Sequence, residues 1–177
     1  MNKRIKLLIV DGYNVLRSGS RYKAITAPDY TDDTFNQARE RLINDCIDFA
    51  GRDWSVMIVF DGAQNEFSSG EVEMIGGVRI MFSPVGQSAD KVIEKLAHDA
   101  RARAVETLVV SSDASIQDTV FGGGVDRMSA NDFSHEIALL HQEQINDASA
   151  HIAPKNTLAE RINPDVKARL EALRDKK

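Results

Sequence analysis

The 177-residue sequence has one cysteine, no long apolar run and no excess of positive charge, and each absence excludes a class of protein. Cys46 has no partner for an internal disulfide, and we expect a buried thiol on the apolar face of a helix. No apolar stretch approaches the roughly 18 residues that span a bilayer, so no membrane partner is predicted. The start of the chain lacks the layout of a secretory signal peptide, and the expected location is cytoplasmic.

Several motifs of nucleotide, nucleophilic and metal chemistry are also missing. Gly122-Gly123-Gly124 lacks the following lysine of a phosphate loop, and it ends a predicted helix instead of opening one. Gly12 stands without the spaced glycines of a dinucleotide fingerprint. The four histidines have no spacing that ties them to a serine or to Cys46, which argues against a catalytic triad and a zinc site. Asp11 has no second aspartate two residues later, which disfavours aspartyl-phosphate chemistry.

The net charge of −5 does not indicate general affinity for nucleic acid, but the charges are unevenly distributed. Residues 1–25 contain six lysines and arginines against one acid, whereas residues 26–100 contain fourteen acids against six bases. Three of the early bases, Arg17, Arg21 and Lys23, follow the first predicted strand. They could form a cationic rim beside an acidic centre, or they could belong to a solvated loop.

Strand-like and helix-like segments alternate along the chain. Residues 7–10 form a continuous apolar run, which is typical of a parallel strand with both faces covered. The other predicted strands are 54–60, 78–82 and 107–110, and residues 62–77 are expected to be irregular or weakly paired. Helices are predicted from Asp32 or Asp33 to Phe49, from Ser88 to Ala100, over 114–121, and from Ser129 to about Gln144.

This order predicts an α/β fold, with a mostly parallel central sheet flanked by helices. We expect a single domain over residues 1–145. Residues 146–156 are polar and contain Pro154, so they are predicted to be a linker. Apolar spacing after Leu158 predicts a helical C-terminal tail, interrupted at Pro164, within residues 146–177.

Four acids occupy comparable places among these elements. Asp11, Asp61 and Asp113 each follow a predicted strand, and Asp90 lies in the first turn of the helix that begins near Ser88. The carboxyl ends of neighbouring parallel strands meet at one edge of a sheet, so these carboxylates should converge. Converging carboxylates repel one another unless a cation neutralises them, and oxygen ligands suit Mg²⁺ or Mn²⁺. The pattern therefore permits metal-assisted hydrolysis of a phosphodiester.

Each acid also has a structural explanation that the sequence leaves open. Asp90 could stabilise a helix N-terminus, Asp113 could cap the short helix, and Asp61 could be a turn residue. Asp11 is harder to explain in this way, because it closes the most apolar strand. Asn14 could bind a ligand or a carboxylate, or it could cap a turn.

Other polar side chains near these acids have the same two interpretations. Gln117 lies four residues after Asp113, on the same helical face, but a lone glutamine more commonly faces solvent. Ser111 and Ser112 could bind a phosphate, or they could satisfy the end of their strand.

The ordered motifs of the chain resemble the YacP-like branch of the NYN domains, a group within the PIN-like nuclease superfamily. The resemblance covers roughly residues 5–145, as judged from the order of elements. The matching segments are Asp11-Gly12-Tyr13-Asn14, Val59-Phe60-Asp61, Ser88-Ala89-Asp90 with Ile93-Glu94-Lys95-Leu96, Ser111-Ser112-Asp113 with Gln117, Phe121-Gly122, and Ser129-Ala130.

The resemblance implies a metal-dependent endoribonuclease that hydrolyses phosphodiester bonds of mRNA or ribosome-associated RNA. It implies Mg²⁺ or Mn²⁺ as the cofactor, and single-stranded RNA and the ribosome as partners. The metal ligands carried over by position are Asp11, Asp90 and Asp113. The other residues carried over to the catalytic site are Asn14, Asp61 and Gln117.

The sequence departs from this pattern where a basic stretch is expected after the second strand. Residues 64–77 contain three glutamates and no base. Phosphate contacts dominate affinity for nucleic acid, so RNA contacts are predicted at four other bases, Arg17, Arg21, Lys23 and Arg79. Two hypotheses follow: an endoribonuclease, or a non-catalytic RNA- or ribosome-binding module that retains the fold.

Overall fold

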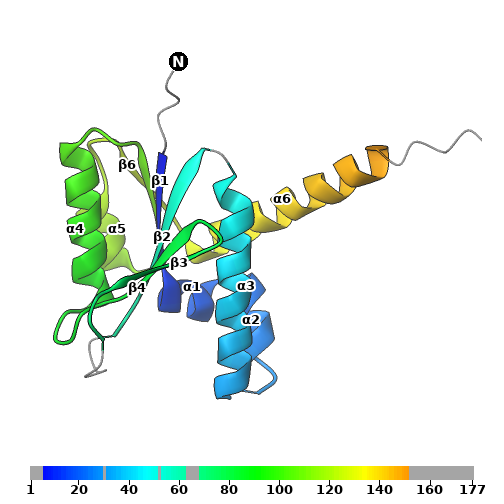
Figure 1. The fold of residues 1–177 in the computed structure, drawn as a ribbon, viewed down its shortest axis with the longest axis horizontal. Coiled ribbons are helices and arrows are strands. Elements are labelled where there is room, and N and C mark those ends of the chain that lie inside the picture. Colours follow the sequence, from blue (N-terminus) through cyan, green and yellow to red (C-terminus); the bar gives the residue numbers. More distant parts are fainter. Residues whose placement is uncertain (1–5, 30, 52, 63–67, 152–177) are drawn as a thin grey trace, which may run out of the picture. The chain divides into compact units, whose positions relative to one another are not determined.

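The structure is a computed structural model that describes residues 6–29, 31–51, 53–62 and 68–151 (Figure 1). The chain divides into two compact units, residues 1–140 and 141–177, and the fold below is that of the first unit. The elements in chain order are β1 (Lys6–Asp11), α1 (Gly12–Ser18), α2 (Ser20–Thr26), α3 (Asp32–Ala50), β2 (Trp54–Phe60), β3 (Val72–Ile75), β4 (Val78–Phe82), α4 (Ala89–Ala102), β5 (Thr107–Val110), α5 (Ala114–Val120), β6 (Val125–Met128) and α6 (Ala130–His151).

The six strands form one sheet in the order β3-β4-β2-β1-β5-β6. Every neighbouring pair is parallel except β3 and β4, which are antiparallel. The predicted α/β fold with a mostly parallel sheet is confirmed. The register places Asp11 beside Val59 and Val10 beside Val110, so β1, β2 and β5 end at the same edge of the sheet. That edge is where the sequence places its strand-end acids.

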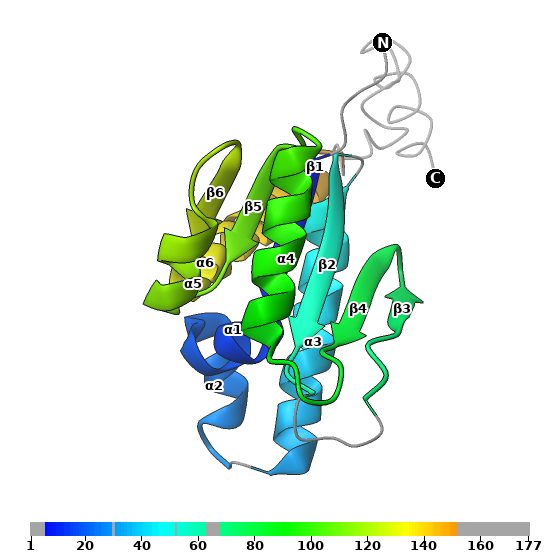
Figure 2. The same ribbon diagram turned by 90° about the vertical axis from the view of Figure 1, so that its left-hand side faces the viewer.

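Helices cover both faces of the sheet, and β1 shows why its apolar run is continuous. Leu8 and Val10 face the core beneath α3, whereas Ile9 faces the core beneath α4. Figure 2 shows α4 in front of β1 and β2, with α3 behind the sheet. All three side chains are fully buried, and each contributes about 1.5–3 kcal/mol by leaving water. The rigid centre of the sheet therefore fixes the position of Asp11.

Four elements were not predicted. Helices α1 and α2 occupy the segment after β1, so Arg17, Arg21 and Lys23 lie on helices and not in a solvated loop. All residues of strand β3 are exposed at the sheet edge, within the segment expected to be irregular or weakly paired. Strand β6 has an exposed middle, which hides the apolar signal of a strand.

Two predicted helix boundaries were wrong. Helix α3 is capped by Thr31, whose side chain accepts from the Thr34 backbone N–H, so Asp32 and Asp33 lie in its first turn. Helix α6 continues through residues 146–151, which were predicted to be linker. These residues contain no proline or glycine, and the first helix-breaking residue downstream is Pro154.

The remaining C-terminal predictions fall mostly outside the described residues. The rest of the linker and the helical tail, residues 152–177, lie there, and the domain boundary at 145 stays a prediction. No helix in the described part of the chain is long and apolar enough to cross a membrane.

Candidate active site

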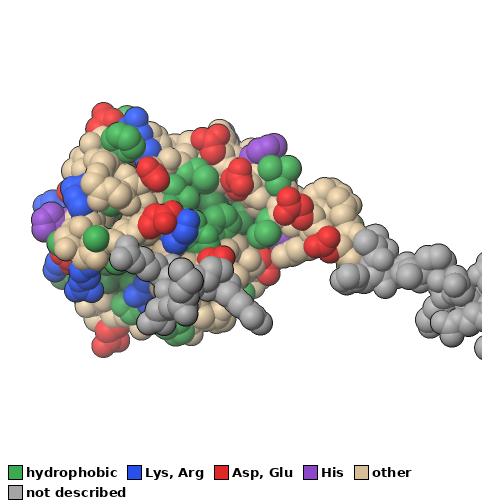
Figure 3. All heavy atoms as spheres, turned by 90° about the horizontal axis from the view of Figure 1, so that it is seen from above, with side chains coloured by type: hydrophobic (Ala, Val, Ile, Leu, Met, Phe, Trp, Pro, Cys, Tyr) green, Lys and Arg blue, Asp and Glu red, His purple; other side chains and the backbone are tan. Residues whose placement is uncertain are grey.

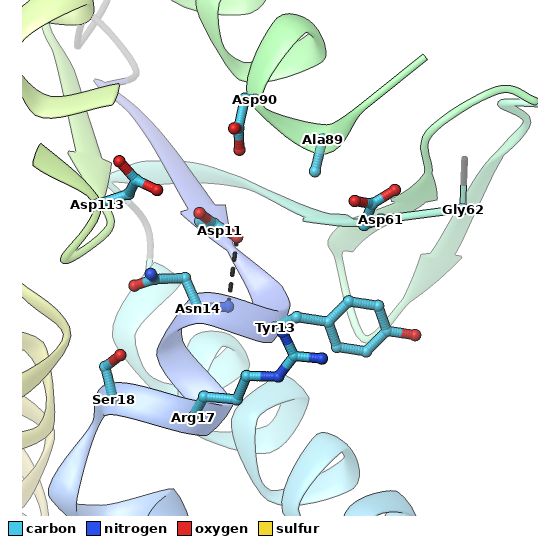
Figure 4. Close-up of a pocket in the computed structure, with 10 residues that line it drawn as sticks. All are labelled: Asp11, Tyr13, Asn14, Arg17, Ser18, Asp61, Gly62, Ala89, Asp90 and Asp113. Carbon is cyan, nitrogen blue, oxygen red and sulfur yellow. Dashed lines mark hydrogen bonds between the residues drawn. The ribbon is translucent and has the colours of Figure 1, made fainter. Parts of the chain in front are cut away.

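A cavity of about 690 Å³ lies where β1, β2 and β5 end (Figure 4). It is lined by Asp11, Tyr13, Asn14, Arg17, Ser18, Asp61, Gly62, Ala89, Asp90 and Asp113. All four predicted acids therefore line one cavity, and we call these ten residues the acid pocket. They come from segments as far apart in the sequence as Asp11 and Asp113, which the sheet brings together.

Asp11 is held in place from two directions. Its Oδ1 accepts from the Asn14 backbone N–H at 3.4 Å, which caps helix α1, and its Oδ2 accepts from the Ser111 hydroxyl at 3.0 Å. Only 7% of Asp11 is exposed. The next residue must be small, because a Cβ on Gly12 would overlap the fully buried ring of Phe60. Hydrogen bonding thus explains the aspartate at position 11, and close packing explains the glycine at position 12.

Asn14 and Gln117 connect the elements around Asp11. The Asn14 side-chain oxygen accepts from the Ser112 backbone N–H at 2.7 Å, which joins α1 to the segment after β5. Gln117 Nε2 donates to the Ser111 carbonyl at 2.6 Å. Gln117 is not among the residues that line the acid pocket, so its observed contact is with the backbone that carries Ser111.

Ser111 links two of the acids, a connection that sequence reasoning left open. Its buried hydroxyl donates to Asp11 and accepts from the Asp113 backbone N–H at 3.1 Å. The available signal was a small hydroxyl side chain directly after a buried strand. Ser112 contributes in a different way, because its hydroxyl accepts from the Ala130 N–H at the start of α6.

The acids differ in how their charge is stabilised. Asp113 caps α5 and accepts from both the hydroxyl and the backbone N–H of Ser115, and these bonds lower its pKa. Burial raises the pKa of Asp11 to about 6. The hydrogen bonds from Ser111 and Asn14 oppose this increase, and repulsion from Asp90 and Asp113 adds smaller increases. Hydrogen bonding therefore favours the ionised form of Asp113, whereas burial favours the protonated form of Asp11.

Asp90 lies in the first turn of α4, directly after the Ser88–Ala89 start of that helix. Its pKa is raised by burial and then by Asp113, Asp61 and Glu94. Asp61 lies near Ser83, whose hydroxyl is 3.5 Å from its Oδ1. The carboxylates are thus close enough to repel one another, and a cation among them would relieve that repulsion.

The acid pocket fits a hydrated divalent cation by the chemistry of its side chains. Mg²⁺ usually keeps several waters and takes only one or two carboxylates directly. Among the residues that the structure describes, no group of three or more histidine, cysteine or acidic side chains is arranged to hold a metal ion. The joint ligation of one ion by Asp11, Asp90 and Asp113 therefore stays a prediction.

The four bases predicted to contact RNA lie in different places. Arg17 is exposed, lines the acid pocket and lies 5.7 Å from the centre of the Tyr13 ring. Arg21 is instead paired with the buried Asp45, with Nε to Oδ2 at 2.7 Å and Nη2 to Oδ1 at 3.1 Å. Lys23 is exposed on α2. Arg79 lies on β4 and lines a second cleft, not the acid pocket.

The fold and the comparisons with known proteins identify this molecule as an NYN domain with a PIN-like nuclease fold. The chain belongs to the YacP-like NYN domain family, which it matches over residues 8–175. The resemblance seen in the sequence is confirmed.

Relatives from Bacillus subtilis show the extent of the similarity. The chain is 29% identical to the protein YacP of Bacillus subtilis (strain 168) over 142 residues, which cover 77% of each chain. The crystal structure of Rae1 (YacP) from Bacillus subtilis matches with a TM-score of 0.66 and 25% identity, over 97% of this chain and 96% of that one. A mutant form of Rae1 matches in fold with a TM-score of 0.67 and 24% identity, over 95% and 99% of the two chains.

Proposed function

We propose that this protein is a metal-dependent endoribonuclease that hydrolyses RNA phosphodiester bonds at the acid pocket. The observation that carries the proposal is the convergence of four aspartates in one cavity, two of them with raised pKa values. Membership of the NYN family supports nuclease chemistry for this arrangement. We further propose that the protein acts in the cytoplasm, on single-stranded regions of mRNA or of ribosome-associated RNA.

Asp11, Asp90 and Asp113 would hold Mg²⁺ or Mn²⁺, with waters completing the coordination. When bound, the ion lowers the pKa of a water and stabilises negative charge on the phosphate. Ser111 orients Asp11, and the bond from Asn14 N–H keeps the Asp11 carboxylate at the end of β1.

Two further residues act on the substrate in this proposal. Asn14 uses its side-chain oxygen for Ser112 N–H, which leaves the Nδ2 donors to bind a phosphate oxygen. Among the described residues that line the acid pocket, Arg17 is the only lysine or arginine, and its guanidinium can bind a second phosphate oxygen. Asp61 and Gln117 support the site, Asp61 from the pocket wall and Gln117 through Ser111.

A cleavage assay tests this proposal. Purified protein is incubated with end-labelled single-stranded RNA in Mg²⁺, Mn²⁺ or chelator, beside Asp11→Asn and Asp113→Asn variants. We expect cleavage only with metal and only in the wild type. The matched control is Asp126→Asn, the same change at an exposed site on β6, and it should cleave normally. Metal-dependent cleavage that survives both pocket substitutions would refute the site assignment.

A second candidate function is a non-catalytic RNA- or ribosome-binding module. Its support is the acidic segment of residues 64–77 and the net charge of −5, which depart from the basic pattern expected of the enzyme. RNA binding without cleavage under every metal condition would favour this module over the enzyme.

A further inference from the structure

A second cleft, of about 360 Å³, lies on the α4 face of the sheet, near the amino ends of the strands. Its floor is largely apolar and comes from β1, β2 and α4, including Leu7, Met57 and Leu96. Two arginines, Arg79 and Arg103, belong to its lining, and we call this the arginine cleft. Figure 3 looks onto this end of the sheet and shows Lys and Arg side chains on its α4 side.

The two arginines have no carboxylate partner among the contacts of the described residues. Arg79 Nη2 donates to the neutral hydroxyl of Ser55 at 2.8 Å, and Arg103 is exposed just after α4 ends. Arg101 differs, because its guanidinium donates to the carbonyls of Val120 and Gly122 and so serves the fold. The charges of Arg79 and Arg103 are therefore available to an anion.

The other two charged residues of the cleft are Lys6, which is paired with an acid, and Asp99, which lies beside an exposed histidine. Lys6 pairs with Glu106 at 2.5 Å and lies 5.5 Å from the centre of the Trp54 ring. The acid of the cleft, Asp99, lies 3.5 Å from the His98 ring nitrogen. The two arginines thus supply most of the cationic character that an entering ligand meets.

Helix α4 connects the arginine cleft with the acid pocket. Asp90 stands in its first turn and Arg103 directly after its last, and a helix of 14 residues is about 21 Å long. Lys91 and Lys95 are exposed between them, and their spacing of four residues places them on one side of the helix. A stacked single strand advances about 3.4 Å per nucleotide, so roughly six nucleotides would cover this distance.

We propose that Arg79 and Arg103 bind the backbone of a single-stranded RNA whose scissile phosphate lies in the acid pocket, with Lys91 and Lys95 contacting the strand between them. The proposal rests on the proposed function and extends it to a substrate that spans both ends of the sheet. The apolar floor offers a surface for an unstacked base, while the arginines neutralise phosphates. A strand too short to span α4 gains nothing from the arginine cleft.

Binding measured without metal tests the span directly. Fluorescence anisotropy in chelator compares a labelled 12-nucleotide single strand with a trinucleotide, for wild type and for Arg79→Gln/Arg103→Gln. We expect the 12-mer affinity of the double variant to fall about tenfold, while the trinucleotide binds as to wild type. The slope of log affinity against log salt should flatten by about 1.4, since each lost phosphate contact removes about 0.7 on a single strand.

The matched control is Arg39→Gln/Arg127→Gln, which removes the same charge from α3 and β6. It should bind both strands as wild type does, and melting curves should show that all variants are folded. Unchanged 12-mer binding by the cleft variant, equal losses for both strands, or a wild type that binds no 12-mer would each overturn the proposal. The assay requires no cleavage, so a protein that binds as expected but never cleaves would contradict only the proposed function.

Discussion

The two ends of the sheet carry opposite charges. At the carboxyl end, β1 places Asp11 beside three further aspartates in the acid pocket. At the amino end, the arginine cleft holds Arg79 and Arg103 above an apolar floor. The net charge of −5 averages over both ends and conceals this separation. Overall charge is thus a poor guide to nucleic-acid binding when a parallel sheet sorts acids and bases by strand end.

A second contrast lies within the early basic segment. Arg17 lines the acid pocket, whereas the Arg21 guanidinium donates two hydrogen bonds to the buried Asp45. The two residues are four positions apart and have the same chemistry. The difference between them is that Asp45 of α3 pairs with Arg21, which makes Arg21 structural, while Arg17 is available to substrate.

The largest expected effect is on the cleavage rate, which should depend on the acid pocket and much less on the arginine cleft. Asp11→Asn or Asp90→Asn should reduce the rate at saturating RNA by about 100-fold or more, because each removes charge from the cation site. Arg79→Gln should instead raise KM with little change in kcat, because its contact is the same in ground state and transition state. Single-turnover and steady-state kinetics on a 12-mer measure both. A fall in kcat for Arg79→Gln as large as that for Asp11→Asn would remove the distinction.

Arg21→Gln should lower the free energy of unfolding by about 2–4 kcal/mol, because it leaves Asp45 buried with less compensation. The Arg41 guanidinium lies 3.5 Å from Asp45 and limits the loss. Urea denaturation gives the stability, and RNA anisotropy on the folded variant should change less than twofold. Arg17→Gln provides the converse, with normal stability and weaker RNA binding. Normal stability with weak RNA binding for Arg21→Gln would contradict this account and indicate that Arg21 contacts RNA.

Asp11→Asn should stabilise the metal-free protein at pH 8. Burial holds the folded pKa of Asp11 at about 6, above its ordinary value of 3.8, so stability is lost as pH rises from about 4 through 6. At about 1.4 kcal/mol per pH unit, the gain from neutralising the side chain is at most about 3 kcal/mol, and it disappears near pH 4. Thermal melts in chelator at both pH values check this. Equal stability of the two proteins at pH 8 would show that Asp11 titrates normally.

Ser111→Ala should move the acid limb of the pH–rate profile to higher pH. The Ser111 hydrogen bond lowers the pKa of Asp11, so its removal lets burial raise that pKa further. Ser115→Ala is the matched control, because it removes a hydroxyl bond that lowers the pKa of Asp113 and not that of Asp11, while the residue 115 backbone N–H still donates to Asp113. An acid limb that shifts equally in both variants would contradict the assignment of that limb to Asp11.

The central sheet could be predicted because strands buried on both faces contain runs of consecutive apolar residues. Strands β1 and β2 lie between two helical layers and are apolar over residues 7–10 and 56–60, and the strand-end acids follow from their shared register. Edge strands are partly exposed and lack such apolar runs. Residues 125–128 read Val-Asp-Arg-Met, and only parallel pairing with β5 makes them a strand.

The site was predictable in its acids and not in their connections. Asp11, Asp61, Asp90 and Asp113 could be placed from strand and helix ends alone. The Arg21–Asp45 pair joins residues 24 positions apart on different helices, and no local sequence pattern predicts it. Long-range hydrogen bonds of this kind depend on how helices pack, which a single sequence does not encode locally.

The central claim is that the acid pocket is a divalent-cation site. A titration with Mn²⁺ followed by electron paramagnetic resonance at pH 7.5, with and without a non-cleavable single-stranded RNA analogue, tests this claim most directly. The account predicts saturable Mn²⁺ binding to wild type that is lost in Asp11→Asn/Asp90→Asn and retained in Asp126→Asn. Mn²⁺ binding that is absent from wild type in both conditions, or unchanged in the pocket variant, would contradict it.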